Sequence, residues 1–406
     1  MNDSVLRPLA ALFTFLCIAL PLHAASIEES IALIKSGSSK QGLSQLEHIA
    51  NTGNAEAQSL LGDIYADGQW VVQNFSTAAK WRERAAAAGH IPAMNAIGKH
   101  YAEGYGVEAD LQLAERYLVT AAETGDREFQ YDAGVLYDNP TNALYKPEQA
   151  IKWYKLAAEQ QQVNAQASYG LMLYQGRGTK SDAAEALTWL QLAAEAGHAA
   201  AQNNLGLLYV RGEGTTQDHD LAVLWFSKAA EGGHSSALTN LAVMYENGLG
   251  VAFDEQEAMR LYKLAGQKSS SNLASAIAKL IVEYDPRLVE MDENAALNEL
   301  KHKAHNNDPV AQFQLGWYHA QLAAEPDFSK ARIAFEASAQ QGMHSAMLNL
   351  GILHLKGLGV PQDFVVGYNW ITRAVAGGSA SAEHTRNSLF PFMMPDQIDR
   401  AQQLSK

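Results

Sequence analysis

Residues that could carry out chemistry are few and scattered along this chain. The sequence has no Gly-x-Ser-x-Gly nucleophile motif, no Gly-x-Gly-x-x-Gly after a strand and no His-Glu-x-x-His zinc motif. Segment 176–181 (GRGTKS) shares glycine, lysine and serine with phosphate-binding loops, but the complete Gly-x-x-x-x-Gly-Lys-Ser spacing is absent. His302 and His305 lie three residues apart on an expected helix, yet a zinc site needs a third ligand. We therefore predict a non-enzymatic protein with no catalytic residue, metal site or cofactor.

The first 24 residues have the features of a cleaved export signal. Arg7 precedes the apolar run 9–20 (LAALFTFLCIAL), which Pro21 ends and the small residues Ala24 and Ala25 follow. The run is shorter than the roughly 20 residues that span a membrane. Cys17, the only cysteine, lies in this run, so the mature chain would have no disulfide and no thiolate. We expect a periplasmic or secreted protein with no membrane span after cleavage.

The charge balance restricts the partners. Lys and Arg total 30 and Asp and Glu total 44, so the formal net charge is −14. Nucleic-acid binding requires a basic face that releases counterions, and anionic membrane surfaces also attract basic segments. We therefore expect a protein or peptide partner, no nucleic acid, and a monomeric chain.

An internal repeat organises most of the sequence. Glycines recur every 36 residues, and alanine takes the last place of this column. Two all-alanine columns and one mainly aromatic column keep the same register, which is typical of a solenoid. The aromatic column is Trp81, Tyr117, Trp153, Trp189, Trp225 and Leu261. The glycine column is Gly62, Gly98, Gly134, Gly170, Gly206 and Ala242. The alanine columns are Ala78, Ala114, Ala150, Ala186, Ala222 and Ala258, and Ala85, Ala121, Ala157, Ala193, Ala229 and Ala265.

Each unit reads as two helices. Helix A, such as 201–210 (AQNNLGLLYV), places its glycine where a second helix can approach closely. Helix B, such as 221–231 (LAVLWFSKAAE), buries Ala222, Trp225 and Ala229 on one stripe. Gly-x-Gly between A and B, and Gly-His between B and the next A, predict left-handed glycine caps.

The stretch 193–214 (AAEAGHAAAQNNLGLLYVRGEG) resembles the Sel-1-like repeat, a relative of the tetratricopeptide repeat. The resemblance covers most of 40–265 and resumes at 306–378, and it implies a superhelix used for protein–protein contact. We predict an all-α fold, a right-handed α/α superhelical solenoid of about nine helix pairs with a cap at each end.

The predicted organisation has six parts. The signal peptide is 1–24, the N-terminal cap 25–53, six 36-residue repeats 54–266, an irregular helix pair 267–305, two further repeats 306–378, and the C-terminal capping helices 379–406. In the irregular pair, helices are expected at about 273–284 and 288–305. The end of the chain is expected to cap an open solenoid with a polar outer face.

The candidate binding surface is the stripe of helix A that faces away from helix B. Helical spacing and superhelical curvature put this stripe on the concave side. Early units place polar residues there and late units place Phe313 and Trp317, but the middle units are largely apolar. The middle residues are Tyr131, Val135, Leu171, Tyr174, Asn203, Leu207, Val210 and Val243. They either receive a partner helix or extended segment or pack within a tightly wound superhelix.

Asn204, Asn240 and Asn349 lie two residues before the glycine column. The resemblance to tetratricopeptide repeats implies that such an asparagine can hold a peptide backbone. A bond to nearby backbone is the alternative, because asparagine readily hydrogen-bonds locally.

Two functions are compatible with these features. The first is a scaffold or adaptor of the bacterial envelope that binds a peptide or helix in its concave groove. The second is a cell-wall or β-lactam ligand binder, or a weak hydrolase, because cysteine-rich relatives of the repeat resemble β-lactam-binding proteins. Those relatives hold each unit with a disulfide, which this chain lacks.

Overall fold

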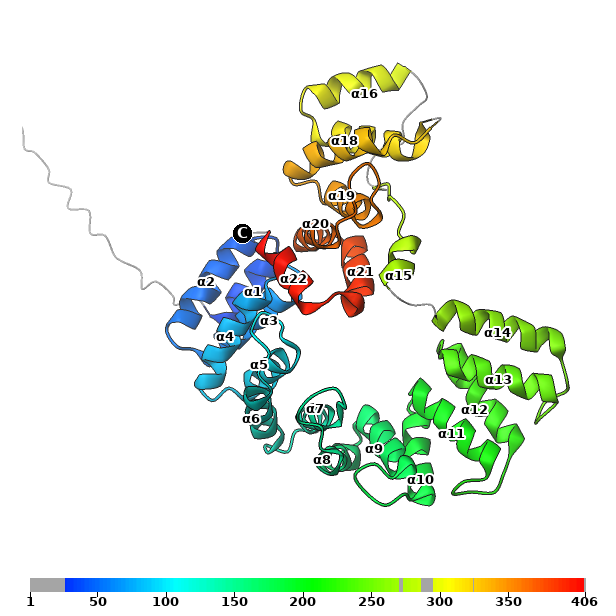
Figure 1. Ribbon diagram of the computed structural model, residues 1–406. Coiled ribbons are helices and arrows are strands. Elements are labelled where there is room, and N and C mark those ends of the chain that lie inside the picture. Colours follow the sequence, from blue (N-terminus) through cyan, green and yellow to red (C-terminus); the bar gives the residue numbers. More distant parts are fainter. Residues whose placement is uncertain (1–25, 270–272, 286–294, 324, 405–406) are drawn as a thin grey trace, which may run out of the picture.

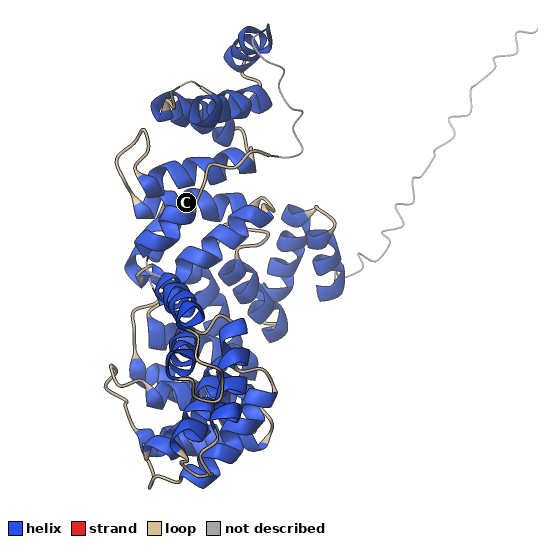
Figure 2. Ribbon diagram, turned by 90° about the vertical axis from the view of Figure 1, so that its right-hand side faces the viewer, coloured by secondary structure: helices blue, strands red, loops and turns tan. Residues whose placement is uncertain are grey.

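The computed structural model describes residues 26–269, 273–285, 295–323 and 325–404. Within them it contains 22 α-helices, two short helical turns and no strand, which confirms the all-α prediction (Figures 1 and 2). The first fourteen helices are α1 (Ile27–Lys35), α2 (Ser39–Asn51), α3 (Ala55–Asp67), α4 (Phe75–Ala87), α5 (Ile91–Glu103), α6 (Leu111–Ala122), α7 (Arg127–Asp138), α8 (Pro147–Glu159), α9 (Val163–Gln175), α10 (Ala183–Glu195), α11 (Ala199–Arg211), α12 (His219–Glu231), α13 (Ser235–Asn247) and α14 (Glu255–Ser269). The others are α15 (Leu273–Lys279), α16 (Ala295–His305), α17 (Pro309–Trp317), α18 (Phe328–Gln340), α19 (His344–Lys356), α20 (Phe364–Ala376), α21 (Ala380–Leu389) and α22 (Pro395–Gln403). The predicted signal peptide, 1–24, lies outside the described residues.

The glycine column lets helices A and B approach closely, as predicted. A Cβ at Gly206 of α11 would lie 2.6 Å from the ring of Phe226 on α12. Both alanine columns are buried, with exposed fractions of 0–4%. The prediction for the aromatic column was too simple. Trp225 is buried, but Trp81, Trp153 and Trp189 are only half-buried. In each helix B it is the residue after the tryptophan that faces the glycine.

The Gly-x-Gly loops have the predicted left-handed conformation, and their two glycines differ in role. In the α13–α14 loop, Gly248 ends α13 with φ +61°, and a Cβ there would find its nearest atom at 3.5 Å. A Cβ on Gly250, at φ +66°, would lie 2.4 Å from the carbonyl oxygen of His219 at the start of α12. The second glycine therefore holds the loop against the preceding repeat.

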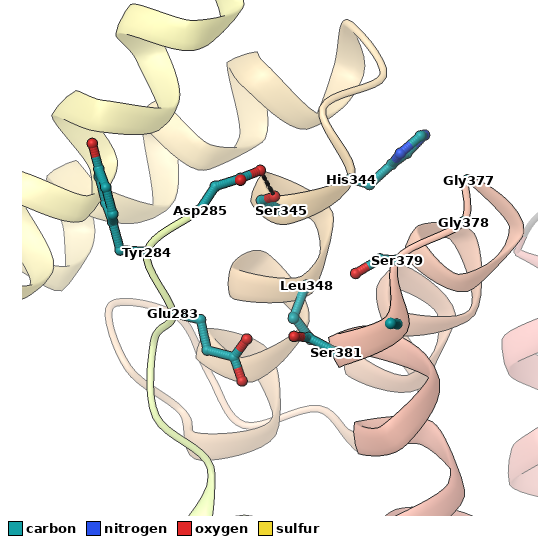
Figure 3. Close-up of a pocket in the computed structure, with 11 residues that line it drawn as sticks. Glu283, Tyr284, Asp285, His344, Ser345, Leu348, Gly377, Gly378, Ser379 and Ser381 are labelled. Carbon is teal, nitrogen blue, oxygen red and sulfur yellow. Dashed lines mark hydrogen bonds between the residues drawn. The ribbon is translucent and has the colours of Figure 1, made fainter. Parts of the chain in front are cut away.

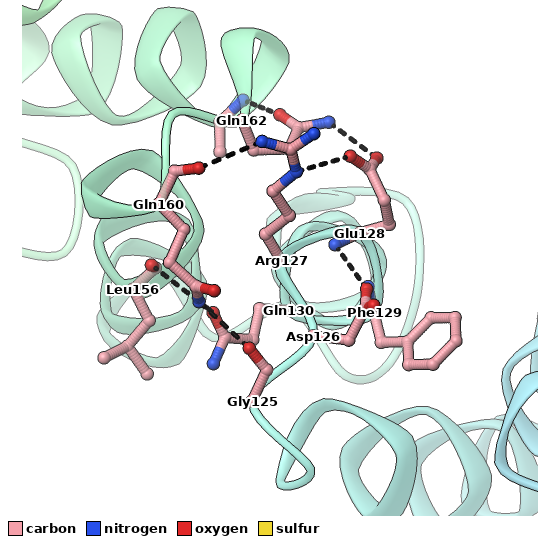
Figure 4. A network of polar contacts seen from close by, with 10 residues as sticks. Gly125, Asp126, Arg127, Glu128, Phe129, Gln130, Leu156, Gln160 and Gln162 are labelled. Carbon is pink, nitrogen blue, oxygen red and sulfur yellow. Dashed lines mark hydrogen bonds and ion pairs between the residues drawn. The ribbon is translucent and has the colours of Figure 1, made fainter.

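The Gly-His turns also form as predicted. His90, His198 and His234 are N-caps whose Nδ1 atoms accept hydrogen bonds from backbone N–H groups. In the α8–α9 turn, Gln161 takes the glycine position and keeps a left-handed φ of +63°. Its neighbour Gln160 donates to the carbonyl of Gly125 (3.0 Å) in a polar network that joins two repeats (Figure 4).

The irregular region differs from the prediction. The expected helix 273–284 ends at Lys279, and residues 280–285 belong to no helix. The residue before a proline avoids the helical conformation, which makes Asp285-Pro286 a poor helix interior. The second expected helix, 288–305, is α16, which begins at Ala295; residues 286–294 lie outside the described part of the chain.

The two ends of the array meet, which corrects the prediction of an open solenoid with a polar end. Figure 1 shows α22 next to the N-terminal helices, and α22 is in contact with α4. Ile398 and Ala401 of α22 are fully buried in a cluster with Phe75 and Ala78 of α4. The backbone N–H of Phe75 donates to Gln402 Oε1 at 2.7 Å. The last helices therefore cover both the pair α19–α20 and the first repeat.

Candidate functional site

The inner side of the array is formed by the first helix of each repeat. Neighbouring first helices contact each other directly, as α5 contacts α7 and α9 contacts α11. Figure 1 shows α7 and α9 on the inner side of the arc and α8 and α10 outside them. The first helices, which carry the predicted stripe, therefore lie on the concave side of the array.

The apolar residues of the middle stripe are partly accessible there. Val135 of α7 and Val243 of α13 are 42% and 39% exposed. The other apolar and aromatic members are half-buried; they are Tyr131, Leu171, Tyr174, Leu207 and Val210. Part of this surface packs within the superhelix, as the alternative interpretation expected, since the ring centroids of Tyr131 on α7 and Tyr154 on α8 are 5.7 Å apart. The stripe therefore combines repeat packing with an accessible face.

Polar side chains on the stripe join neighbouring repeats. The Tyr174 hydroxyl donates to Glu213 Oε2 at 2.6 Å and accepts from Arg211. This bond to Glu213, together with burial, raises the pKa of Tyr174. At the polar early end, Asn95 and Lys99 both donate to Asp132 Oδ2, at 2.7 and 2.9 Å.

The asparagines of the middle groove form a short chain across α11 and α13. Asn240 Nδ2 donates to Asn203 Oδ1 at 2.9 Å, and Asn203 Nδ2 donates to Asn204 Oδ1 at 3.5 Å. Asn203 is buried, so it holds Asn240 rather than facing solvent. Asn204 and Asn240 remain half-buried at the groove surface.

The late part of the groove contains the chain's own extended segment, 280–285. Asn349 of α19 makes two hydrogen bonds to the backbone of Glu283. Its Oδ1 accepts from the Glu283 N–H at 2.9 Å, and its Nδ2 donates to the Glu283 carbonyl at 2.7 Å. An asparagine of the predicted column thus holds an extended main chain in the groove.

Side chains of the segment also have defined positions. The Ser345 hydroxyl donates to Asp285 Oδ2 at 2.5 Å, beside a cavity of about 240 Å³ (Figure 3). The ring of Tyr284 lies 4.7 Å from that of Trp317 and 6.2 Å from that of Phe313. The two late residues of the predicted stripe therefore receive an aromatic side chain.

The comparisons with known proteins agree with this architecture. A family profile described as "Sel1 repeat" matches eight segments. They are 55–90, 91–126, 127–161, 163–198, 199–234, 235–270, 309–343 and 344–379. The chain belongs to the Sel1 repeat family.

Solved structures with the same repeats are similar over much of the chain. One is c5321 of Escherichia coli, described as a protective antigen of uropathogenic strains with an SLR fold. It is 25% identical with a TM-score of 0.52, and the match covers 89% of this chain and 93% of that one. A Sel1 repeat protein of Oxalobacter formigenes is 28% identical with a TM-score of 0.51, covering 59% and 96%. No match is found among curated proteins.

Two features of this chain were not predicted as functional. Segment 280–285 has no periodic signal, and only the Asp285-Pro286 pair indicates that it is extended. A buried glutamine on several first helices donates to the last turn of the preceding helix, as Gln202 does to the Ala194 carbonyl at 3.0 Å. Its recurrence in register with the repeat period, in Gln58, Gln166 and Gln202, could have revealed this second feature.

The segments predicted to lack chemistry lie where a repeat protein places its turns and outer faces. Gly176 caps α9, and Ser181 Oγ donates to the Tyr174 carbonyl at 2.8 Å. His302 and His305 are exposed on α16. Among the described residues, no three His, Cys, Asp or Glu side chains are grouped as a metal site would need. No helix in that part of the chain combines the length and apolar character needed to cross a membrane.

Proposed function

We propose that this protein is a non-enzymatic scaffold of the bacterial envelope that binds an extended segment or helix of a partner protein in its middle groove. Sel1 repeat proteins are generally protein–protein interaction scaffolds. The observation that carries the groove proposal is the pair of hydrogen bonds between Asn349 and the Glu283 backbone. It supports the groove of this array as a surface that takes an extended chain.

The middle groove repeats the side chains that hold segment 280–285. Helices α13 and α19 both have 13 residues, with serine second and asparagine sixth. Ser236 and Asn240 thus correspond to Ser345 and Asn349. Leu207, on the preceding first helix, takes the place of Trp317. We infer that Asn240 can hydrogen-bond to the main chain of a bound peptide, next to the apolar side chain of Leu207. This combination is suited to peptide recognition.

A photo-crosslinking experiment tests the middle groove. The photoreactive amino acid p-benzoylphenylalanine would replace Val135 or Val243 on the inner face. Matched controls would replace Leu192 of α10 or Leu224 of α12, which are 42% and 45% exposed. We expect a discrete crosslinked partner from the inner positions alone. Equal crosslinking from both sets would contradict groove binding.

Substitutions test the same groove in solution. The double substitution Leu171→Ser and Leu207→Ser should reduce capture of the crosslinked partner by about tenfold or more, because apolar and aromatic anchors dominate such binding. The control Leu192→Ser should leave capture unchanged. Circular dichroism must show that both proteins keep their helicity. Loss of helicity in the groove variant would show instead that Leu171 and Leu207 are core residues.

The envelope location is a separate part of the proposal. It depends on residues 1–24, and N-terminal sequencing of protein recovered from the periplasm should begin at Ala25 or Ser26. An intact N-terminus in the cytoplasmic fraction would refute it. The cell-wall or β-lactam alternative gains no specific support, because Cys17 is the only cysteine and the relatives that suggest it have a disulfide in each unit.

A further inference from the structure

The late groove is more than an internal contact between repeats. Segment 280–285 contributes no helix to the array. Figure 3 shows its run through Glu283, Tyr284 and Asp285 as an uncoiled, extended chain beside α19. Asn349 lies beneath this segment and is fully buried. Both hydrogen bonds from Asn349 go to main-chain atoms, which every residue type possesses. This half of the contact can therefore accept an extended chain of any sequence.

The remaining contacts select particular side chains. Tyr284 packs against the aromatic rings of α17, and Val282 is buried in the apolar core of the late repeats. Asp285 is buried and bound by Ser345 near the start of α19. The cavity beside it is also lined by 377–381, so the starts of α19 and α21 border the same cavity as Asp285 (Figure 3). Helix N-termini favour an anionic group. Ile281 points outward, with 68% of its surface exposed.

From these contacts we propose that the surface formed by α17, α19 and the start of α21 is a second peptide-binding site, whose present occupant is segment 280–285. Its ligand is an extended segment of a partner protein with the order apolar, any residue, aromatic, acidic. The internal segment has the advantage of a high effective concentration, since it belongs to the same chain. A partner must therefore compete with it. The site is distinct from the middle groove and does not depend on Asn204 or Asn240.

A peptide added in trans tests the proposal with the full-length chain. The probe is fluorescein-labelled KLIVEYDP, residues 279–286, and its binding is measured by fluorescence anisotropy. The protein carries Val282→Ser and Tyr284→Ser, which remove the two anchoring side chains of the internal segment. We expect the probe to bind this variant at least tenfold more tightly than it binds the unaltered protein.

Two further substitutions locate the binding. Adding Asn349→Ala to the variant should weaken binding of the probe by roughly tenfold or more, since two hydrogen bonds are lost. Adding Asn240→Ala, the corresponding asparagine of the middle groove, should leave the affinity unchanged. A probe with asparagine in place of aspartate should bind more weakly than the original probe. Sensitivity to Asn240→Ala alone would assign the probe to the middle groove and overturn this second site while leaving the proposed function intact.

Absence of binding by a folded variant would also overturn the proposal. If the variant with both serines loses its helical circular dichroism signal, Glu283→Pro is used instead. Proline removes the backbone N–H that donates a hydrogen bond to Asn349. Loss of the fold in both proteins would show that the segment is an integral part of the core. The segment would then not be an exchangeable ligand.

Discussion

The two glycines of a single loop should differ sharply in their tolerance of alanine. Gly248 and Gly250 both have left-handed φ angles, +61° and +66°. Alanine at either position pays for this conformation, which costs roughly 1–2 kcal/mol for a residue with a Cβ. Only at Gly250 would the new methyl group also meet backbone, because the His219 carbonyl oxygen would lie 2.4 Å away.

The difference between the two variants follows from that contact. A backbone carbonyl at the start of α12 cannot rotate away as a side chain can, so the loop or the helix must shift. Overpacking of this kind costs about 1–3 kcal/mol. Gly248→Ala should therefore lower the free energy of unfolding by roughly 1–2 kcal/mol. Gly250→Ala should lower it by about 2–5 kcal/mol when both costs are added.

Urea unfolding followed by circular dichroism measures both values. With a urea dependence of about 1–3 kcal/mol/M, the transition of the Gly250 variant should fall on the order of 1 M below that of the Gly248 variant. Hydrogen exchange should place the loss of protection in α12, α13 and α14. Equal destabilisation by the two substitutions would refute the assignment of Gly250 to inter-repeat contact.

Three further results are expected. Burial, together with the charge of Arg82, lowers the pKa of His100 to about 4. Between about pH 4 and 6.5 the unfolded chain therefore binds a proton at this histidine that the folded chain does not bind. The free energy of unfolding should consequently rise with pH in this window. His100→Gln should flatten that rise by on the order of 3 kcal/mol in pH-dependent denaturation. Gln161→Gly should raise the free energy of unfolding by roughly 0.5–1 kcal/mol, because glycine tolerates the left-handed φ; a lower denaturation midpoint would contradict this. Ile398→Glu should separate the ends of the array, seen as a larger radius of gyration in small-angle X-ray scattering at unchanged helicity, and an unchanged radius would count against a closure held by α22.

Much of the architecture follows from the 36-residue period. Each repeat uses local contacts between helices that are adjacent in the sequence, so the same residue types recur at the same positions. Gly206 predicted the close approach to the next helix, and the alanine columns predicted the buried seams. His198 shows how a column member can be recognised as structural before its N-cap bond is seen. The burial of the aromatic column was harder to predict, since the angle between the helices decides whether Trp189 or its neighbour Leu190 faces Gly170.

The middle groove could be predicted as a stripe but not as a set of contacts. Helical spacing placed Leu207 and Val243 on one inner face. It could not show that Asn203 is buried beneath Asn240, because that bond depends on how closely α11 and α13 approach each other.

The sequence by itself determined the repeat, its helices and their caps, because these depend on spacing and on the conformational preferences of glycine, alanine and proline. Only the tertiary structure decided that α22 packs against α4 and that Asn349 binds the main chain of Glu283. These contacts join residues far apart in the chain, and no periodic spacing in the sequence predicts them. They form because the curvature accumulated over many repeats brings distant apolar and hydrogen-bonding surfaces together.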